Sequence, residues 1–246
     1  MTANPIRTAT LHKLAQYDTP TICNIIELFE VRPNDVGYMD RRIQAAFPDM
    51  QPIVGFAATA SLRSVSGSRE NAYGMLEAQL NQMDQLAGPA IVVFQDLDDP
   101  PVGATFGEVM CSTYQAFGSV GLITSGGARD LAQVRALGYS VFSASTICSH
   151  ANCQTVDVGS RVRIGGLPVQ TGDLLHGDAN GVTNIPIEIV TEVAEVADEF
   201  MAAEAHVINY VKTTGQKQIA ELALKRQAMA ESLAALRRRV SRKGNR

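Results

Sequence analysis

The chain has 246 residues, 46% of them hydrophobic and 19% charged, which is typical of a folded globular protein and excludes a disordered or fibrous one. No apolar run approaches the ~18 residues of a membrane span, so we expect no membrane partner. Residues 1–20 lack the apolar core of a secretion signal, and four cysteines are too few for a disulfide framework. We therefore expect a cytoplasmic protein. The absence of Trp and an aromatic content of only 6% argue against a base-stacking surface for single-stranded nucleic acid.

The net charge of −4 is unevenly distributed. Residues 212–246 carry a net charge of +8, whereas residues 1–211 carry −12. An acidic body repels a phosphate backbone, so we expect no nucleic-acid partner. These observations predict one domain over 1–211 and a basic helical extension over 212–246.

Hydrophobic periodicity predicts the elements in chain order. We expect helices over 8–17, 21–29, 69–86, 107–117, from about residue 130, over 186–210 and over 216–240. We expect strands over 53–65, 90–95, 120–124 and 139–144, loops over 32–52 and 96–101, and a second, glycine-rich β-sheet over 155–185. The alternation of strands and helices in the middle of the chain predicts parallel strands with crossover helices, and therefore an α/β fold of mixed sheets with helices outside.

The strongest local feature is VGLITSGGARD over 120–130. A buried strand is expected to enter a glycine turn over 125–128 and to present Arg129 and Asp130 side by side. Ligands of α/β folds bind beyond the carboxyl ends of strands, where an Arg can contact a carboxylate at two points and an Asp can hold Mg²⁺. The alternative is a surface ion pair near a helix start.

The second feature is TFGEVM over 105–110. Thr105 and Glu108 have the spacing of a capping box. A helix that starts at Gly107 also leaves backbone N–H groups that can bind an anion, and Glu108 is placed to face a metal across a pocket. The sequence leaves both interpretations open.

Other candidate residues point mainly to structural roles. Cys148, His150 and Cys153 have no fourth ligand nearby and match no common zinc module, so we favour locally satisfied loop residues over a zinc site. His176 is expected to be structural, with a place near a site as the alternative. The sequence contains no Gly-rich nucleotide motif and no hydrolase nucleophile elbow.

Three stretches together resemble a known family: FGEVMCSTYQAFGSVGLITSGGARD, GYSVF and TGDLLHGDANGVTNIP. They are similar to the regulator-of-ribonuclease-activity-A-like family, which includes the class II 4-hydroxy-4-methyl-2-oxoglutarate / 4-carboxy-4-hydroxy-2-oxoadipate aldolases. The resemblance runs from about residue 19 to about residue 206. It implies a three-layer β/β/α swivelling-type domain with mixed sheets, here followed by a C-terminal helical extension. It also implies a homotrimer or homohexamer with sites between subunits.

The resemblance also implies a metal and a substrate site. Asp130 would hold Mg²⁺ or Mn²⁺, and Arg129 would hold a pyruvate-like carboxylate or keto group. Glu108 matches an acidic residue that lies near the metal in the aldolases.

Further site residues follow from the same resemblance. The backbone N–H groups of Val109 and Met110, which follow Gly107, would face the substrate. Glu204 is the candidate for a glutamate that reaches a neighbouring subunit's site in the aldolases.

The chain departs from the family pattern at three positions. Ser125 stands where the family usually has Asp, Gln133 stands where the aldolases have an acidic residue, and Asn24 stands where many members have Asp. The implied function is a divalent-metal-dependent C–C lyase that acts on pyruvate-derived oxo acids through a pyruvate enolate, with oxaloacetate decarboxylation as a side activity. The alternative, which Ser125 and Gln133 favour, is a non-catalytic trimeric protein that binds and regulates another enzyme.

Overall fold

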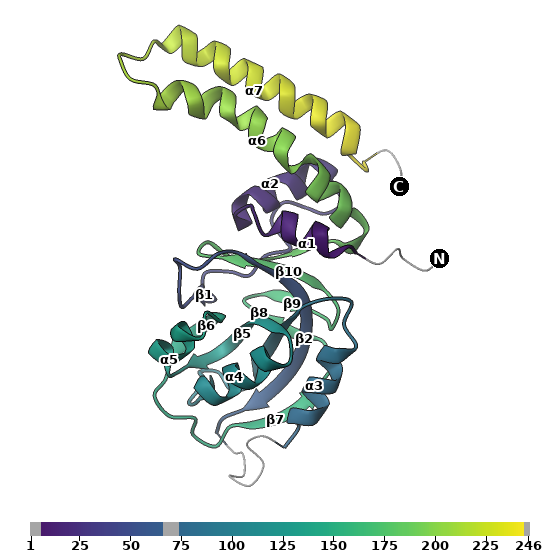
Figure 1. The fold of residues 1–246 in the computed structure, drawn as a ribbon, viewed down its shortest axis with the longest axis vertical. Helices are drawn as coiled ribbons and strands as arrows, with labels where there is room; N and C mark the ends of the chain where they lie inside the picture. Colours follow the sequence, from purple (N-terminus) through teal and green to yellow (C-terminus); the bar gives the residue numbers. More distant parts are fainter. Residues whose placement is uncertain (1–5, 66–73, 244–246) are drawn as a thin grey trace. The chain divides into compact units, whose positions relative to one another are not determined.

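The computed structural model describes residues 6–65 and 74–243, which divide into two compact units (Figure 1). Unit 1 comprises the described residues up to Thr19 together with Val36–Ile187, and unit 2 comprises Pro20–Asp35 and the described residues from Glu188 onward. Within the described ranges, no helix is long and apolar enough to cross a membrane. The predicted division into 1–211 and 212–246 stays a prediction.

Unit 1 is built on a mixed sheet in which the described residues form nine strands. Four central strands pair in parallel: β2 (Ile53–Arg63), β3 (Ala90–Asp96), β5 (Ser119–Ala128) and β6 (Ser140–Thr146). The other strands are β1 (Gln44–Ala45), β4 (Ala104–Phe106), β7 (Gln154–Val158), β10 (Leu174–Asp178) and β11 (Gly181–Ile185). The order is β1-β6-β5-β3-β2-β10-β11, with β4 beside β5 and β7 beside β2. The predicted parallel core is therefore confirmed.

Helices cover one face of this sheet and a β-hairpin covers the other. The helical layer contains α3 (Leu76–Asp84), α4 (Glu108–Ala116) and α5 (Leu131–Ala136), and the hairpin consists of β8 (Val162–Ile164) and β9 (Leu167–Val169). Successive side chains of a strand point to opposite faces, so β3 sends Val92 and Phe94 to the helices but Ile91 and Val93 to the hairpin. A further helix, α1 (Thr8–Leu14), begins the described chain. The three-layer β/β/α architecture predicted from the resemblance is confirmed.

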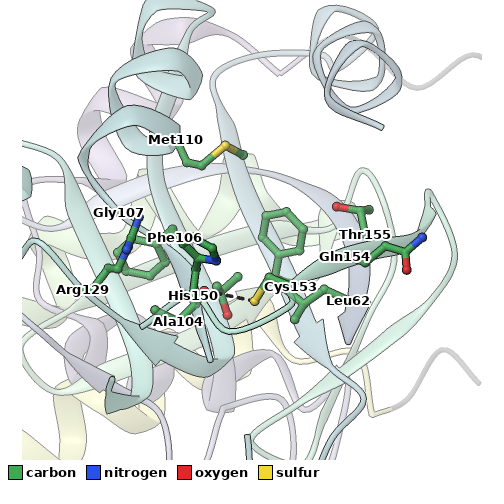
Figure 2. A pocket seen from close by; sticks show the side chains of 12 residues that line it. Leu62, Ala104, Phe106, Gly107, Met110, Arg129, His150, Cys153, Gln154 and Thr155 are labelled. Atoms are coloured by element: carbon green, nitrogen blue, oxygen red, sulfur yellow. Dashed lines mark hydrogen bonds between the residues drawn. The ribbon is translucent and has the colours of Figure 1, made fainter. Parts of the chain in front are cut away.

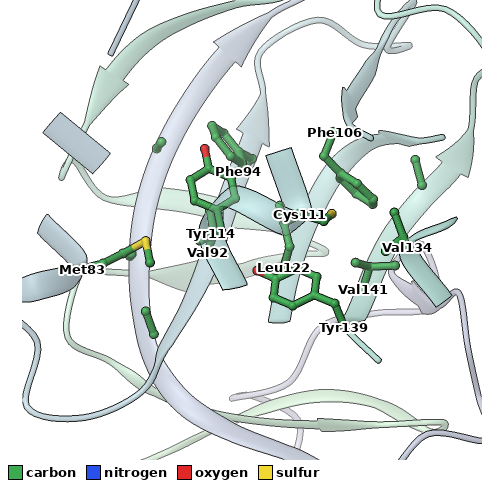
Figure 3. Close-up of a cluster of buried hydrophobic side chains, with 14 of the residues drawn as sticks. Met83, Val92, Phe94, Phe106, Cys111, Tyr114, Leu122, Val134, Tyr139 and Val141 are labelled. Atoms are coloured by element: carbon green, nitrogen blue, oxygen red, sulfur yellow. The ribbon is translucent and has the colours of Figure 1, made fainter. Parts of the chain in front are cut away.

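The core beneath α4 fixes the position of that helix (Figure 3). Tyr114 of α4 and Tyr139, just before β6, are fully buried, and the ring of Tyr114 lies 6.4 Å from that of Phe94. The Tyr139 hydroxyl shares a 2.7 Å hydrogen bond with the Ser119 hydroxyl at the start of β5. Full burial of Tyr114 beside Phe94 of β3 anchors α4 on the sheet, and Tyr139 links the start of β6 to β5.

One expectation about β-structure and one about a helix need correction. The second sheet over 155–185 contains only β8 and β9, because β10 pairs with β2, β11 pairs with β10, and β7 pairs with the far end of β2. The predicted helix over 69–86 begins later, at Leu76, while residues 69–73 lie outside the described ranges.

The glycine turn predicted over 125–128 is also wrong, because β5 continues through it. Gly127 and Ala128 pair with β6 on one side and with β4 on the other. A Cβ atom on Gly126 would lie 2.4 Å from Thr105 Oγ1 and 3.0 Å from Asp96 Oδ2. Glycine is required here for the close approach of neighbouring strands and not for a reversal of the chain.

Unit 2 is helical. It contains most of α2 (Thr19–Phe29), followed later in the chain by α6 (Val190–Lys212) and α7 (Ile219–Val240), which pack along one another. Near the end of α7, Leu236 and Val240 are buried, and Arg239 pairs with Glu199 of α6 at 2.7 Å. The predicted long helices are therefore both present, with ends shifted by a few residues.

Candidate functional site

The site begins at the N-terminus of α4, which directly follows β4. Gly107 is the N-cap, and the N–H of Cys111 donates to the Gly107 carbonyl at 3.1 Å. The N–H groups at the start of an α-helix have no acceptor within the helix. That of Glu108 donates instead to Asp130 Oδ2, at 3.0 Å. The next two, on Val109 and Met110, are oriented by the same helix start.

The capping box predicted at Thr105 and Glu108 is wrong. The Thr105 hydroxyl shares a 2.8 Å hydrogen bond with the hydroxyl of Thr124, and no side chain at the N-cap position caps α4. Thr105 belongs to β4, whose pairing with β5 directs its side chain across the sheet. The carboxylate that caps α4 therefore comes from the far end of β5.

Arg129 and Asp130 lie immediately after β5. Asp130 has φ 53° and ψ 38°, the left-handed conformation that few residues other than Gly, Asn and Asp adopt. This conformation turns the chain into α5 while its carboxylate reaches α4. Asp130 Oδ2 lies 3.9 Å from Arg129 Nε, and the two side chains are about one-third exposed, at 30% for Arg129 and 35% for Asp130. A strained backbone that holds two charged groups at a strand end is a typical feature of functional sites.

The absence of a side chain at Gly107 permits this arrangement. A Cβ atom there would lie 2.3 Å from Asp130 Oδ2 and 3.0 Å from Arg129 Nε. Any larger residue would push the Asp130 carboxylate away from the helix start. The structure therefore brings together Gly107, the backbone of Glu108, Arg129 and Asp130, while their roles toward a metal and a substrate stay predictions.

A pocket of about 70 Å³ opens beside Arg129 (Figure 2). Gly107 and Met110 of the α4 start line it together with Arg129, while Leu62 and Phe94 belong to its apolar part. Sequence reasoning missed Leu62 and Phe94, since buried apolar residues in strands carry no signal that separates a pocket wall from the core.

Cys153 lines the same pocket. Its Sγ donates to the carbonyl oxygen of Ala104 at 3.2 Å, and burial raises the pKa of its thiol to about 11. The thiol is therefore protonated near neutral pH, so Cys153 contributes an uncharged group to the wall of the pocket.

The other candidates are placed as follows. Cys148 is exposed, and Nδ1 of His150 contacts the carbonyl oxygen of Ala151 at 2.9 Å. Glu204 lies on α6 in unit 2, so its place in a neighbouring subunit's site stays a prediction. Gln133 is exposed on α5, and Asn24 lies on α2.

His176 has a structural role. It is fully buried on β10, with Nδ1 at 2.9 Å from Thr19 Oγ1 and Nε2 at 3.2 Å from the carbonyl oxygen of Leu14. The carbonyl contact requires a proton on Nε2, so Nδ1 accepts from Thr19 in the neutral ring. Burial lowers the pKa of His176.

The donor set at Asp130 is compatible with a Mg²⁺ ion. Across residues 6–65 and 74–243, no group of three or more His, Cys, Asp and Glu side chains converges to hold a metal. Mg²⁺ does not need such a group, because it commonly uses one or two carboxylates and keeps several waters. The Glu108 N–H and the Arg129 guanidinium both contact Oδ2 of Asp130, which leaves Oδ1 without a hydrogen bond to the described residues.

A family model described as RraA-like (Aldolase/RraA) matches residues 19–183, a span that includes β2, the α4 start and the Arg129–Asp130 pair. The chain belongs to the RraA-like family.

The RraA-like chain is similar to proteins of bacteria. A protein of Halalkalibacterium halodurans, provisionally named as a 4-hydroxy-4-methyl-2-oxoglutarate aldolase, is 30% identical over 101 residues, which cover 41% of this chain and 48% of that relative. The match thus spans about half the length of that relative.

Two solved structures share the fold. An uncharacterised protein from Pseudomonas syringae has a TM-score of 0.69 and 22% identity, covering 92% of this chain and 97% of that one. RraAS2 of Streptomyces coelicolor, described as an unusual member of the RNase ES inhibitor RraA protein family, has a TM-score of 0.64 and 20% identity, covering 82% and 96%. At these identities the likeness supports a common fold.

Proposed function

We propose that this RraA-like chain is a divalent-metal-dependent C–C lyase that cleaves pyruvate-derived oxo acids. The observation that carries the proposal is the placement of the Arg129 guanidinium and the Asp130 carboxylate together at the N-terminus of α4, beside a small pocket. Membership of a family named for aldolases and for RraA supports the same reaction class.

The chain's own groups supply the binding of the oxo acid. Arg129 offers two parallel N–H donors to the substrate carboxylate, a contact that Lys cannot reproduce. The N–H groups of Val109 and Met110 add donors at the positive end of the α4 dipole. Asp130 would hold Mg²⁺ or Mn²⁺, which when bound would stabilise the negative charge that develops on the keto oxygen.

The reaction is a retro-aldol cleavage. A base takes the proton of the C4 hydroxyl, the C3–C4 bond breaks, C4 becomes a carbonyl carbon, and the electron pair remains on C3 as pyruvate enolate. Protonation at C3 then yields pyruvate. Two carboxylates are candidates for the side chain that relays this proton. They are Glu108, which is exposed at the start of α4, and Glu204 of the partner subunit.

Fixed donors around the developing enolate account for most of the expected rate enhancement. Decarboxylation of oxaloacetate passes through the same enolate, so it is the expected side activity. We also propose a homotrimeric or homohexameric assembly, as the family resemblance implies. The small number of cysteines and the lack of an apolar secretion signal in residues 1–20 favour the cytoplasm.

A non-catalytic protein-binding regulator is the alternative. Among the described residues Asp130 belongs to no group of three or more metal-type side chains. Ser125, which stands where the family usually has Asp, accepts a 2.9 Å hydrogen bond from the Asp96 N–H and so serves the sheet.

Pyruvate release separates the two functions. The protein is incubated with Mg²⁺ and either 4-hydroxy-4-methyl-2-oxoglutarate or 4-hydroxy-2-oxopentanoate, and pyruvate is followed by reduction with lactate dehydrogenase. A lyase releases pyruvate from at least one of them, and EDTA stops the release. No pyruvate above the protein-free control from either compound contradicts the lyase and favours the regulator.

A further inference from the structure

The pocket beside Arg129 is small. Its volume is about 70 Å³.

The charge of the pocket is concentrated at one end. Among the described residues that line it, Arg129 alone carries a permanent charge, and no lining residue is a carboxylate (Figure 2). Leu62, Phe94 and Phe106 contribute apolar walls, and each is only 2% exposed. One end therefore suits a carboxylate, and the walls suit uncharged carbon.

Several of the polar groups along the walls are already engaged, and two further polar lining residues, Gln154 and Thr155, are uncharged. The Thr105 hydroxyl is paired with Thr124, and the Cys153 thiol, which stays protonated, donates to the carbonyl of Ala104. His150 is exposed, and its ring contacts the carbonyl of Ala151. A second carboxylate against these walls would lose water without gaining a cation from the described lining residues, which is unfavourable.

Resting on the proposed function, we propose that the site selects 4-hydroxy-2-oxo acids with a single carboxylate and a short uncharged alkyl end. Cleavage of the C3–C4 bond then releases pyruvate and a small uncharged aldehyde or ketone, whose carbonyl oxygen is the former C4 hydroxyl oxygen. A second oxo acid is not the expected co-product.

Binding of two unreactive ligands tests this selectivity apart from catalysis. 2-Oxopentanoate and 2-oxoglutarate have the same five-carbon backbone and lack a 4-hydroxyl group, and they differ in a terminal methyl against a terminal carboxylate. By titration calorimetry with Mg²⁺ present, 2-oxopentanoate is expected to bind at least about tenfold more tightly, the discrimination typical of a hydrophobic pocket. Equal or tighter binding of 2-oxoglutarate, or no binding of 2-oxopentanoate at millimolar concentration, overturns the inference.

Substitutions at Cys153 test whether this pocket causes the preference for 2-oxopentanoate over 2-oxoglutarate. Cys153→Lys introduces a cation into the wall and is expected to lower the ratio of affinities at least tenfold toward 2-oxoglutarate, whereas the uncharged Cys153→Met should leave the order unchanged. If Cys153→Lys does not fold, Thr155→Lys takes its place in the experiment, because Thr155 also lines the pocket and is partly exposed. An unchanged ratio in the folded lysine variant contradicts the role of the pocket. The proposed lyase activity is tested separately, by pyruvate release, so its failure can be distinguished from a failure of the proposed selectivity.

Discussion

The carboxylate of Asp130 accepts a hydrogen bond from the backbone N–H of Glu108 at 3.0 Å, so the residue that starts α5 caps the start of α4. This contact joins two segments, each recognisable in the sequence, at one corner of the sheet. It also means that Asp130 has a structural role beside its proposed role as a metal ligand, and the two roles can be separated by substitution.

Asp130→Ala and Asp130→Asn should differ in stability but not in activity. The Ala variant loses the cap of α4, a change that typically costs about 0.5–2 kcal/mol, whereas the Asn variant keeps an acceptor oxygen and tolerates the left-handed backbone. Both lose the charged ligand and therefore metal-dependent turnover. Urea unfolding and pyruvate release measured on both variants check this. Wild-type rates with Mg²⁺ in either variant contradict the metal role.

Arg129→Lys is expected to lower kcat/KM roughly a hundredfold, as removal of one positioned donor does at other charge-stabilising sites. Lys keeps the positive charge but not the planar two-point contact. Because Arg129 is 30% exposed and its ion pair with Asp130 is long, the thermal midpoint should stay close to that of the wild type. Activity equal to wild type rules out the assigned substrate contact.

Gln133→Glu is expected to tighten the apparent Mg²⁺ affinity. Gln133 is exposed in the first turn of α5, three residues after Asp130, and a carboxylate there adds negative charge near the proposed metal. The test is a titration of activity against Mg²⁺ for both proteins, with Gln133→Ala as an uncharged control. An unchanged or weaker midpoint in the Glu variant would count against the alignment of α5 with the aldolases.

The pairing of Arg129 with Asp130 was predictable because both follow one buried strand, but the contact of Asp130 with α4 was not. That contact depends on a left-handed backbone at Asp130 and on the missing side chain of Gly107, and neither leaves a periodic signal. The turn over 125–128 was predicted wrongly for the same reason, because the sequence alone does not distinguish glycines that permit close strand packing from glycines that form a turn. The capping box failed because tertiary pairing of β4 with β5 gave Thr105 another partner.

His176 should make stability depend on pH below neutrality. Its pKa is lowered by burial in the folded protein, whereas the unfolded chain has the ordinary value of about 6.5, so unfolding takes up a proton as the pH falls below that value. Stability from the neutral ring is fully present above the unfolded-state pKa of about 6.5 and is lost as the pH falls below it. Urea unfolding at several pH values should show a steeper loss for the wild type than for His176→Gln. Identical slopes contradict this prediction.

Truncation after Thr214 should lower the thermal stability and change the oligomer mass. Part of the apolar surface of α7 is buried at Leu236 and Val240, but Ile219 is 89% and Leu224 is 65% exposed, so part of it has no cover within the described chain. We expect that remainder to pack against another subunit, because an isolated helix cannot bury such a surface. Light scattering and thermal unfolding test this. An oligomer mass and a midpoint that both stay unchanged would exclude the packing role.

The most direct test of the proposed lyase is the metal dependence of pyruvate release by the wild type and Asp130→Asn, measured with the same 4-hydroxy-2-oxo acid. The wild type should release pyruvate with Mg²⁺, stop after EDTA and recover when Mg²⁺ is returned in excess, while Asp130→Asn should remain at the protein-free rate throughout. Release that persists in EDTA, or an Asp130→Asn variant that matches the wild type, would contradict a metal-dependent reaction at the Arg129–Asp130 corner.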